Sequence, residues 1–468
     1  MTRRKKAALH NLGCKVNAYE TDAMQLLLEE AGYEIVPFQE MADVYVINTC
    51  SVTNMADRKS RQMIHRAKKK NPQAIVVAAG CYVQTSIEEV QQDLAVDIII
   101  GNNQKNHLVE QIETYVKLHG LDERDAKANE KVLETTEETV PGQKIVDCVD
   151  INDGSQDYEY FLVNKTAEHT RAFIKVQDGC NQFCSYCIIP YARGRVRSRA
   201  IDDVVEEVRG LAEAGYKEIV LTGIHLSSYG LMENYNSGFA HNHLITLIET
   251  VAQVDGIERI RLGSLEPQII TEEFALRLAK VDKICPHFHL SLQSGCDATL
   301  KRMNRKYTAE EYAAGCARLR KYFDQPAITT DVIVGFPGES EEEFATTEAY
   351  LREIGFYEMH IFKYSKRKGT KAAVMPNQVN EQVKTKRSDI LLACEEQMSK
   401  TYRDGYVGRK VEVLFETPWE WEGKPYYTGY TREYIRVAYP TTENLSNQIK
   451  MGVLGEEIAE NIYLLNDK

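Results

Sequence analysis

Three cysteines in the segment CNQFCSYC, Cys180, Cys184 and Cys187, fall within eight positions of the sequence. Thiolates are soft ligands that suit iron, and one tight loop lets three sulfur atoms converge on a cubane cluster while a fourth iron stays open. Since the chain has eleven cysteines in 468 residues, a chance match to this spacing is on the order of one in a hundred or less. Structural zinc is the alternative, but it normally requires four closed ligands, and the loop has no fourth cysteine or histidine.

A second set of cysteines, Cys14, Cys50 and Cys81, is spread over the first hundred residues. Each follows a short apolar run, AALHNLG, DVYVINT or AIVVAAG. If these runs are parallel strands, their carboxyl ends share the sheet edge at which open α/β sheets bind ligands. One such cysteine alone would be interpreted as a small buried hydrophobic residue, but three at equivalent positions favour a shared thiolate site.

The remaining cysteines show no ligand spacing and are interpreted as packing residues: Cys148, Cys285, Cys296, Cys316 and Cys394.

Four segments must position these thiols. Residues 3–118 alternate short β-type runs with helical ones, which predicts an α/β domain with a largely parallel sheet. Residues 119–165 are mainly polar and acidic, and predict a linker. Six successive βα units over residues 166–397 predict a partial α/β barrel with its chemistry at the carboxyl ends of the strands. Residues 400–468 consist of β-type runs broken by glycine and proline, which predict a small β-barrel.

Composition narrows the class of protein. The net charge of −12 and pI near 5.6 disfavour a chain that binds nucleic acid over its whole surface. Local basic runs remain candidates for phosphate contacts: residues 58–70, residues 363–371, and the ARGRVRSR run with Arg193, Arg195, Arg197 and Arg199. Because the sequence shows no long apolar run and no cleavable leader, we expect a cytoplasmic protein with no membrane partner. The odd number of cysteines argues against a framework of disulfides.

The CNQFCSYC segment, with Tyr186 before its last cysteine, resembles the signature of radical S-adenosylmethionine (SAM) enzymes. Together with Cys14, Cys50 and Cys81 and the β-type tail, the whole chain resembles the radical SAM methylthiotransferase family, in which the tail is a TRAM domain. The resemblance implies two 4Fe-4S clusters, one on each cysteine triad, and SAM as cofactor. It assigns the SAM contacts to Tyr186, Thr222, Gly223, Ser291, Gln293, Asp331, Val334 and Gly335.

The resemblance also implies a reaction. One SAM methylates a sulfur species on the Cys14/Cys50/Cys81 cluster, and a second SAM, cleaved at the other cluster, yields a radical that abstracts hydrogen from the substrate. An aromatic C–H bond is a poor match for a side-chain base, so no general base is assigned. The expected partners are a tRNA anticodon stem-loop, an electron donor such as flavodoxin or ferredoxin, and a sulfur source.

Substrate choice depends on local sequence. The segment LGCKVNAYE around Cys14 resembles the branch that methylthiolates C2 of N6-threonylcarbamoyladenosine at position 37 of tRNA. N6-isopentenyladenosine in tRNA and an aspartate of a ribosomal protein are the alternative substrates. A non-catalytic iron–sulfur electron carrier and a zinc-containing RNA-binding scaffold are the alternative classes. Because the tail is acidic, RNA contacts there would depend on aromatic residues such as Trp419, Trp421, Tyr426 and Tyr427.

Overall fold

The computed structural model describes residues 4–121, 143–153, 156–165, 170–231 and 243–467. The chain forms two compact units. The first comprises Met1–Ala167, Asp178–Asn181 and Cys187–Arg197, and the second comprises the remaining residues. Within the predicted linker, residues 119–165, the structure leaves residues 122–142 and 154–155 outside the described residues.

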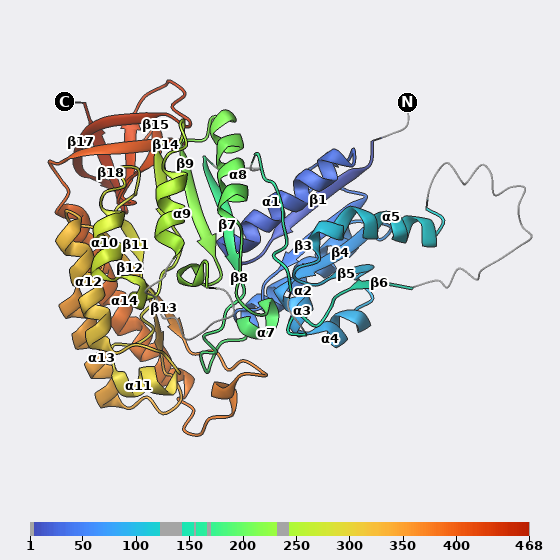
Figure 1. Cartoon of the computed structure of the whole chain (residues 1–468), viewed down its shortest axis with the longest axis horizontal. Coiled ribbons are helices and arrows are strands. Elements are labelled where there is room, and N and C mark those ends of the chain that lie inside the picture. The colour runs from blue at the N-terminus through green and yellow to red at the C-terminus, as the bar shows by residue number, and fades with distance from the viewer. Residues whose placement is uncertain (1–3, 122–142, 154–155, 166–169, 232–242, 468) are drawn as a thin grey trace, which may run out of the picture. The chain divides into compact units, whose positions relative to one another are not determined.

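A six-stranded parallel sheet forms the centre of the first unit, with strand order β2-β1-β3-β4-β5-β6 (Figure 1). Its strands are β1 (Lys6–Asn11), β2 (Glu34–Ile35), β3 (Val44–Thr49), β4 (Ile75–Gly80), β5 (Ile98–Ile100) and β6 (Ile145–Asp147). The predicted parallel α/β domain is therefore confirmed. The edge strand β6, however, comes from the segment for which a linker is predicted, and it pairs with β5. The three residues of β6 are too few to show a strand pattern in the sequence, and this strand forms because it pairs with β5.

Helices cover both faces of this sheet because alternate residues of each strand point to opposite sides. One face packs against α1 (Lys15–Glu30) and α5 (Leu108–Leu118), through residues such as Met24 and Ile112. The other packs against α2 (Asn54–Lys70), α3 (Cys81–Thr85) and α4 (Ile87–Gln92). The central strands β3, β4 and β5 are fully buried and mainly apolar, as expected for a sheet covered on both sides.

The second unit begins with the predicted βα barrel. Two sheets, with orders β10-β9-β7-β8 and β11-β12-β13, are joined by isolated parallel bridges such as Leu265 to Leu290. Strands β10, β9 and β7 run parallel in the first sheet, and β11, β12 and β13 run parallel in the second. The strands are β7 (Arg171–Asp178), β8 (Arg197–Ser198), β9 (Glu218–Gly223), β10 (Arg259–Leu262), β11 (His287–His289), β12 (Ala327–Val334) and β13 (Glu358–Lys363). Apart from the two-residue β8, the strands β7 and β9 to β13 follow one another in sequence order, which confirms a partial (βα)6 barrel (Figure 1).

Helices surround this barrel and share one large apolar core with its strands. They are α8 (Ile201–Glu213), α9 (His243–Val251), α10 (Glu272–Leu278), α11 (Asp297–Arg302), α12 (Ala309–Tyr322) and α13 (Glu341–Ile354). Helix α7 (Ile189–Arg193) belongs to the first unit. Short 3-10 helices are η1 (Lys105–His107), η2 (Leu226–Ser228), η4 (Pro267–Ile269) and η5 (Lys371–Val374).

The C-terminal strands close into a small barrel of order β14-β15-β16-β18-β17. They are β14 (Lys410–Trp421), β15 (Lys424–Thr431), β16 (Arg436–Pro440), β17 (Ile449–Ala459) and β18 (Ile462–Asn466). The predicted β-barrel is confirmed. The boundary predicted between residues 397 and 400 falls inside helix α14 (Glu381–Asp404), which ends shortly before β14 begins at Lys410.

A buried ion-pair group joins this barrel to the βα barrel within the second unit. The Glu218 carboxylate accepts a hydrogen bond from Arg261 Nε at 2.8 Å, and Arg259 Nε donates to Glu412 on β14 at 2.8 Å. Burial by itself raises the pKa of Glu218, but Arg261, Arg171 and Arg259 hold that pKa below its ordinary value. The carboxylate therefore stabilises the folded state in its charged form.

We expect Glu218→Gln to destabilise the chain by about 3 kcal/mol at neutral pH, because the variant leaves buried guanidinium groups without their carboxylate. A carboxyl group whose pKa is lower in the folded chain than in the unfolded chain stabilises the folded state at pH values above its unfolded pKa of about 4.3. This stabilisation is lost as the pH falls through the lower pKa of the folded state. The difference between wild type and variant in urea unfolding should therefore shrink below about pH 4.

Glu258→Gln is the matched control, because Glu258 is exposed and lies 3.9 Å from Lys217. It should change stability by less than about 0.5 kcal/mol. Equal losses in the two variants would contradict a special role for the Glu218 group.

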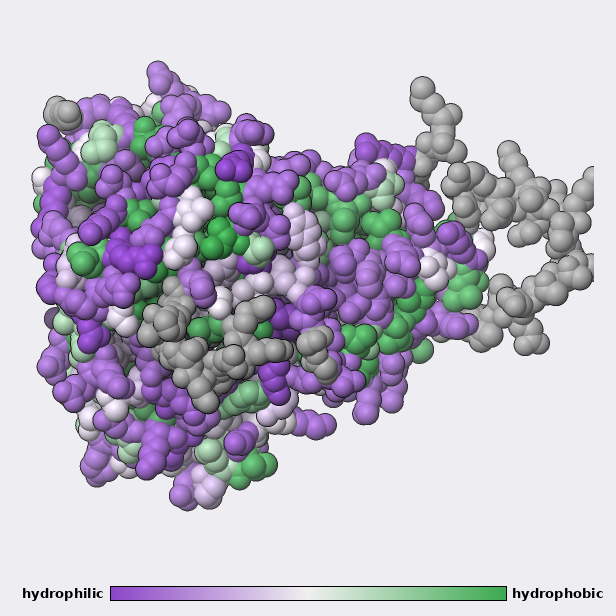
Figure 2. Space-filling model, in the orientation of Figure 1, coloured by the Kyte–Doolittle hydropathy of each residue, from purple (hydrophilic) through white to green (hydrophobic). Residues whose placement is uncertain are grey.

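The visible molecular surface is mainly hydrophilic, with hydrophobic side chains in scattered groups (Figure 2). Within the described ranges, no helix is both long enough and apolar enough to span a bilayer.

Candidate iron–sulfur and SAM site

Cys14, Cys50 and Cys81 follow β1, β3 and β4, which are neighbours in the sheet. The order in which strands are added to the sheet changes side at β1: β2 lies on one side of β1, and all later strands lie on the other. Open α/β sheets bind ligands at the carboxyl edge beside such a switch point. The topology therefore brings the three predicted thiols to the place where the fold is built to hold a ligand.

The turns that carry these thiols approach one another closely. Gly13 has φ +126°, and a Cβ at this position would lie 3.1 Å from Cys50 Sγ. Burial, together with negative charge on Cys81 and Cys14, raises the pKa of the Cys50 thiol to about 11. Because these thiols oppose one another's ionisation, a cationic metal centre is the natural partner for three thiolates here.

The turn before Cys81 requires glycine. Gly80 has φ +98° and ψ −157°, a region that side chains avoid, and an added Cβ would lie 2.6 Å from Asn48 Oδ1 and 2.8 Å from Thr49 O. Any larger residue must push β4 away from the turn that carries Cys50.

Gly80→Ala is therefore expected to reduce the iron bound by the N-terminal triad by at least about half, measured as iron per chain after anaerobic reconstitution. Gly32→Ala is the matched control, because Gly32 also has positive φ, +88°, but an added Cβ meets nothing within 4 Å. It should cost about 1–2 kcal/mol of stability and leave the iron content unchanged. Equal iron loss in both variants would mean that backbone strain, not crowding at the site, is responsible.

Cys148 follows β6 at the same sheet edge, but β5 separates β6 from β4. Its Sγ would lie 2.9 Å from a Cβ at Gly101, and burial raises its thiol pKa to about 11. Because β5 lies between Cys148 and the strands that carry the triad, we continue to interpret Cys148 as a packing residue. It is therefore a useful control for the triad.

The cysteines of the CNQFCSYC loop are shared between the units: Cys180 and Cys187 belong to the first, and Cys184 to the second. In the second unit, Arg305 Nη1 donates to Cys184 Sγ at 3.2 Å. Arg305 Nη2 also donates to both oxygens of Glu266, each at 2.7 Å. A buried guanidinium held by a carboxylate thus faces the Cys184 sulfur, which suits a thiolate ligand. Arg305 could not be predicted from the sequence, because no local pattern links it to the loop.

Tyr186, the aromatic residue before Cys187, packs in a small apolar cluster of the second unit. Its ring centroid lies 6.2 Å from that of Phe336, which in turn lies 5.4 Å from Tyr364. Phe336 directly follows Gly335 in the sequence.

Most residues expected to contact SAM lie at or beyond the carboxyl ends of barrel strands: Thr222 and Gly223 on β9, Ser291 and Gln293 after β11, and Val334 and Gly335 at the end of β12. Asp331 lies inside β12. Gln293 has φ +75°, and its backbone bonds to β12 through Asp331 O and Ile333 N. A non-glycine residue with positive φ at a strand end is a frequent feature of functional sites. Val334 is different, since its side chain is buried in the core between strands and helices and only its backbone can serve a ligand.

Asp331 belongs to a polar group on the barrel strands. Its Oδ2 lies 3.4 Å from His289 Nε2, and one ligand atom from each of Asp331, His289 and His360 lies within 4.8 Å of the others. His289 Nδ1 is 3.0 Å from Thr329 Oγ1. The carboxylate of Asp331 is therefore positioned by a neighbouring histidine.

The ARGRVRSR prediction is wrong for three of its four arginines. Arg193, Arg197 and Arg199 are buried, and Arg199 pairs with Glu207 at 2.6 Å. They neutralise internal carboxylates and cannot serve as a phosphate-binding patch, because phosphate contacts need accessible cations. Only Arg195 of this run is exposed.

Family models match two parts of the chain: "Uncharacterized protein family UPF0004" over residues 6–101 and "Radical SAM superfamily" over residues 174–351. The first contains the N-terminal triad and the second the CNQFCSYC loop.

Several named proteins are similar to this chain over most of its length. The threonylcarbamoyladenosine tRNA methylthiotransferase MtaB of Bacillus subtilis is 42% identical over 444 residues, which cover 94% of this chain and 92% of that protein. The MtaB of Aquifex aeolicus is 40% identical, covering 87% of this chain and 92% of its own. The tRNA-2-methylthio-N(6)-dimethylallyladenosine synthase of Acetivibrio thermocellus is 34% identical, covering 92% and 84%.

Among solved structures, the radical SAM methyltransferase TsrM from Kitasatospora setae matches with a TM-score of 0.54 at 14% identity, covering 80% of this chain and 74% of TsrM. This likeness supports the radical SAM fold.

Proposed function

Because the chain belongs to the radical SAM tRNA methylthiotransferase family, we propose that it transfers a methylthio group to C2 of N6-threonylcarbamoyladenosine at position 37 of tRNA. As a member of this family it is an iron–sulfur enzyme that uses 4Fe-4S clusters and SAM. The observation that carries the proposed substrate is the 42% identity to a threonylcarbamoyladenosine enzyme, against 34% to an enzyme named for dimethylallyladenosine. The LGCKVNAYE segment supports the same choice.

Cys14, Cys50 and Cys81 would hold one cluster, and Cys180, Cys184 and Cys187 the other. When bound, the clusters and two SAM molecules would supply methyl transfer to sulfur and radical cleavage of the C–H bond. The chain's own task is to hold and orient these groups. Tyr186, Thr222, Gly223, Ser291, Gln293, Asp331, Val334 and Gly335 would contact SAM at the barrel strand ends, and no side chain is required as a general base.

Two surfaces, one in each unit, could contact RNA. Helix α2 follows Cys50 and exposes cations including Arg58, Lys59 and Arg66, which suit backbone phosphates. On the β14–β15 hairpin the Trp419 and Trp421 rings stack at 5.3 Å, and Trp421 is exposed. Such rings are platforms for unpaired bases and fit the expected TRAM role of this barrel.

Tyr426 packs at 5.7 Å against Trp419 and extends that aromatic surface, whereas Tyr427 is buried in the barrel core and cannot contribute. The anticodon stem-loop would be the RNA partner, in the cytoplasm, with flavodoxin or ferredoxin as electron donor and a separate sulfur source.

Mass spectrometry of tRNA nucleosides from cells with and without this gene tests the substrate. Deletion should remove the 2-methylthio form of N6-threonylcarbamoyladenosine, and the wild-type gene should restore it. Loss of the isopentenyl-type product instead, or unchanged tRNA with an unmodified ribosomal-protein aspartate, would assign the chain to another branch.

A further inference from the structure

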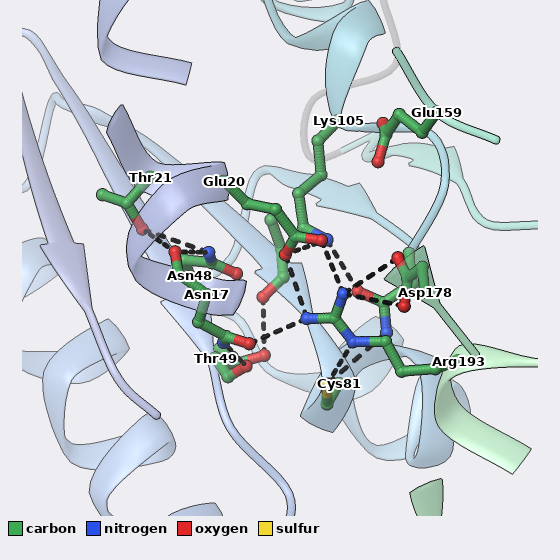
Figure 3. Close-up of polar contacts among 12 residues, drawn as sticks. Asn17, Glu20, Thr21, Asn48, Thr49, Cys81, Lys105, Glu159, Asp178 and Arg193 are labelled. Atoms are coloured by element: carbon green, nitrogen blue, oxygen red, sulfur yellow. Dashed lines mark hydrogen bonds and ion pairs between the residues drawn. The ribbon is translucent and has the colours of Figure 1, made fainter. Parts of the chain in front are cut away.

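A single buried arginine connects the segment after the CNQFCSYC loop with all three N-terminal cysteine turns. Arg193, in α7, is fully buried within the first unit. Its guanidinium lies among side chains from α1, α3 and the end of β7 (Figure 3). It pairs with Glu20 through Nη1 at 2.5 Å and Nη2 at 3.0 Å, and Nη1 lies 3.2 Å from Asp178 Oδ2.

The third nitrogen of this guanidinium reaches sulfur. Arg193 Nε donates to Cys81 Sγ at 3.3 Å, and Asn102 Nδ2 approaches the same sulfur at 3.6 Å. Charge-assisted donors stabilise a thiolate, and donors to a ligand sulfur favour the reduced, more negative state of an iron–sulfur cluster. Asn102 is in turn held by Lys105 Nζ, which donates to its Oδ1 at 2.7 Å.

The same guanidinium also reaches the other two cysteine turns through Asn17. Arg193 Nη2 donates to Asn17 Oδ1 at 2.8 Å. Asn17 Nδ2 donates to Leu12 O at 2.9 Å and to Thr49 O at 3.0 Å, just before Cys14 and Cys50 respectively. The planar guanidinium of Arg193 thus bonds to Cys81 directly and contacts the other two turns through Asn17. A lysine ammonium cannot make the same set of bonds.

We propose that Arg193 is a positioning residue that orients the N-terminal thiolates and, through its bond to Cys81 Sγ, raises the reduction potential of the cluster they hold. This inference rests on the proposed function, because it takes Cys81 as a cluster ligand. It makes the segment directly after the radical SAM loop part of the N-terminal site.

The test uses the full chain with Cys180, Cys184 and Cys187 replaced by alanine, so that only the N-terminal cluster remains. In this background, an electron paramagnetic resonance redox titration compares Arg193→Lys and Asn102→Ala with the parent. Each should retain iron and shift the cluster to a more negative potential. For Arg193→Lys we expect at least a tenfold change in the reduction equilibrium, about 59 mV for a one-electron couple.

Arg197→Lys is the matched control. Arg197 lies in the same segment and is 3.7 Å from the same Asp178, but its hydrogen bonds go to Arg193 O and Arg195 O, not to sulfur. It should titrate like the parent.

The outcomes separate this inference from the proposed function. A parent that binds no cluster would refute the N-terminal ligand assignment itself. A cluster with unchanged potential in both Arg193→Lys and Asn102→Ala would overturn the role of these donors while leaving the ligand assignment intact. If Arg193→Lys loses iron, Asn102→Ala decides, since it removes a donor from the same sulfur without removing the guanidinium.

Discussion

Cys14→Ala should lower the iron of the anaerobically reconstituted chain from about eight to about four atoms, because one of two four-iron clusters loses a ligand. Formation of 5'-deoxyadenosine from SAM should persist, since the CNQFCSYC loop is intact, but methylthiolated tRNA should fall below detection. Iron analysis, chromatography of the SAM products and nucleoside mass spectrometry measure the three quantities on one preparation.

Cys148→Ala is the control for that variant. Cys148 occupies the same sheet edge, beyond β5, and is partly buried. It should retain about eight irons and both activities. Equal iron loss in Cys148→Ala and Cys14→Ala would contradict the ligand set. Tightly bound zinc without iron in the wild type would contradict iron–sulfur chemistry altogether.

Cys184→Ala should have the opposite pattern: about four irons remain, on the N-terminal triad, and 5'-deoxyadenosine formation falls below detection. Methylthiolation should be lost as well, because no radical forms. The variant also leaves Arg305 facing Glu266 without its sulfur partner, so that folding must be checked by circular dichroism.

Cys316→Ala provides the comparison within the barrel. Cys316 is buried on α12 in the apolar core, and burial raises its thiol pKa to about 12. A small loss of packing with unchanged SAM cleavage is expected. SAM cleavage that persists in Cys184→Ala would refute the assignment of the loop.

Sequence by itself determined which cysteines are offered as ligands and the architecture that carries them. The CNQFCSYC spacing is a local property, and so is the position of a cysteine directly after each of three apolar runs. The alternation of β-type and helical runs likewise predicted the α/β sheet, the (βα)6 barrel and the closing β-barrel, because patterns of period two and 3.6 reflect which face of each element is buried.

Tertiary structure decided everything that depends on partners distant in sequence. The sequence ARGRVRSR predicts an exposed basic run, but Arg193 is buried against Glu20 and Cys81, which belong to other elements of the first unit. Strand β6 exists because β5 offers it a parallel edge. Arg305 and the sulfur it faces are 121 positions apart. A charged side chain is buried only where a matching charge or acceptor is provided, and that match depends on the folded chain rather than on the neighbouring sequence.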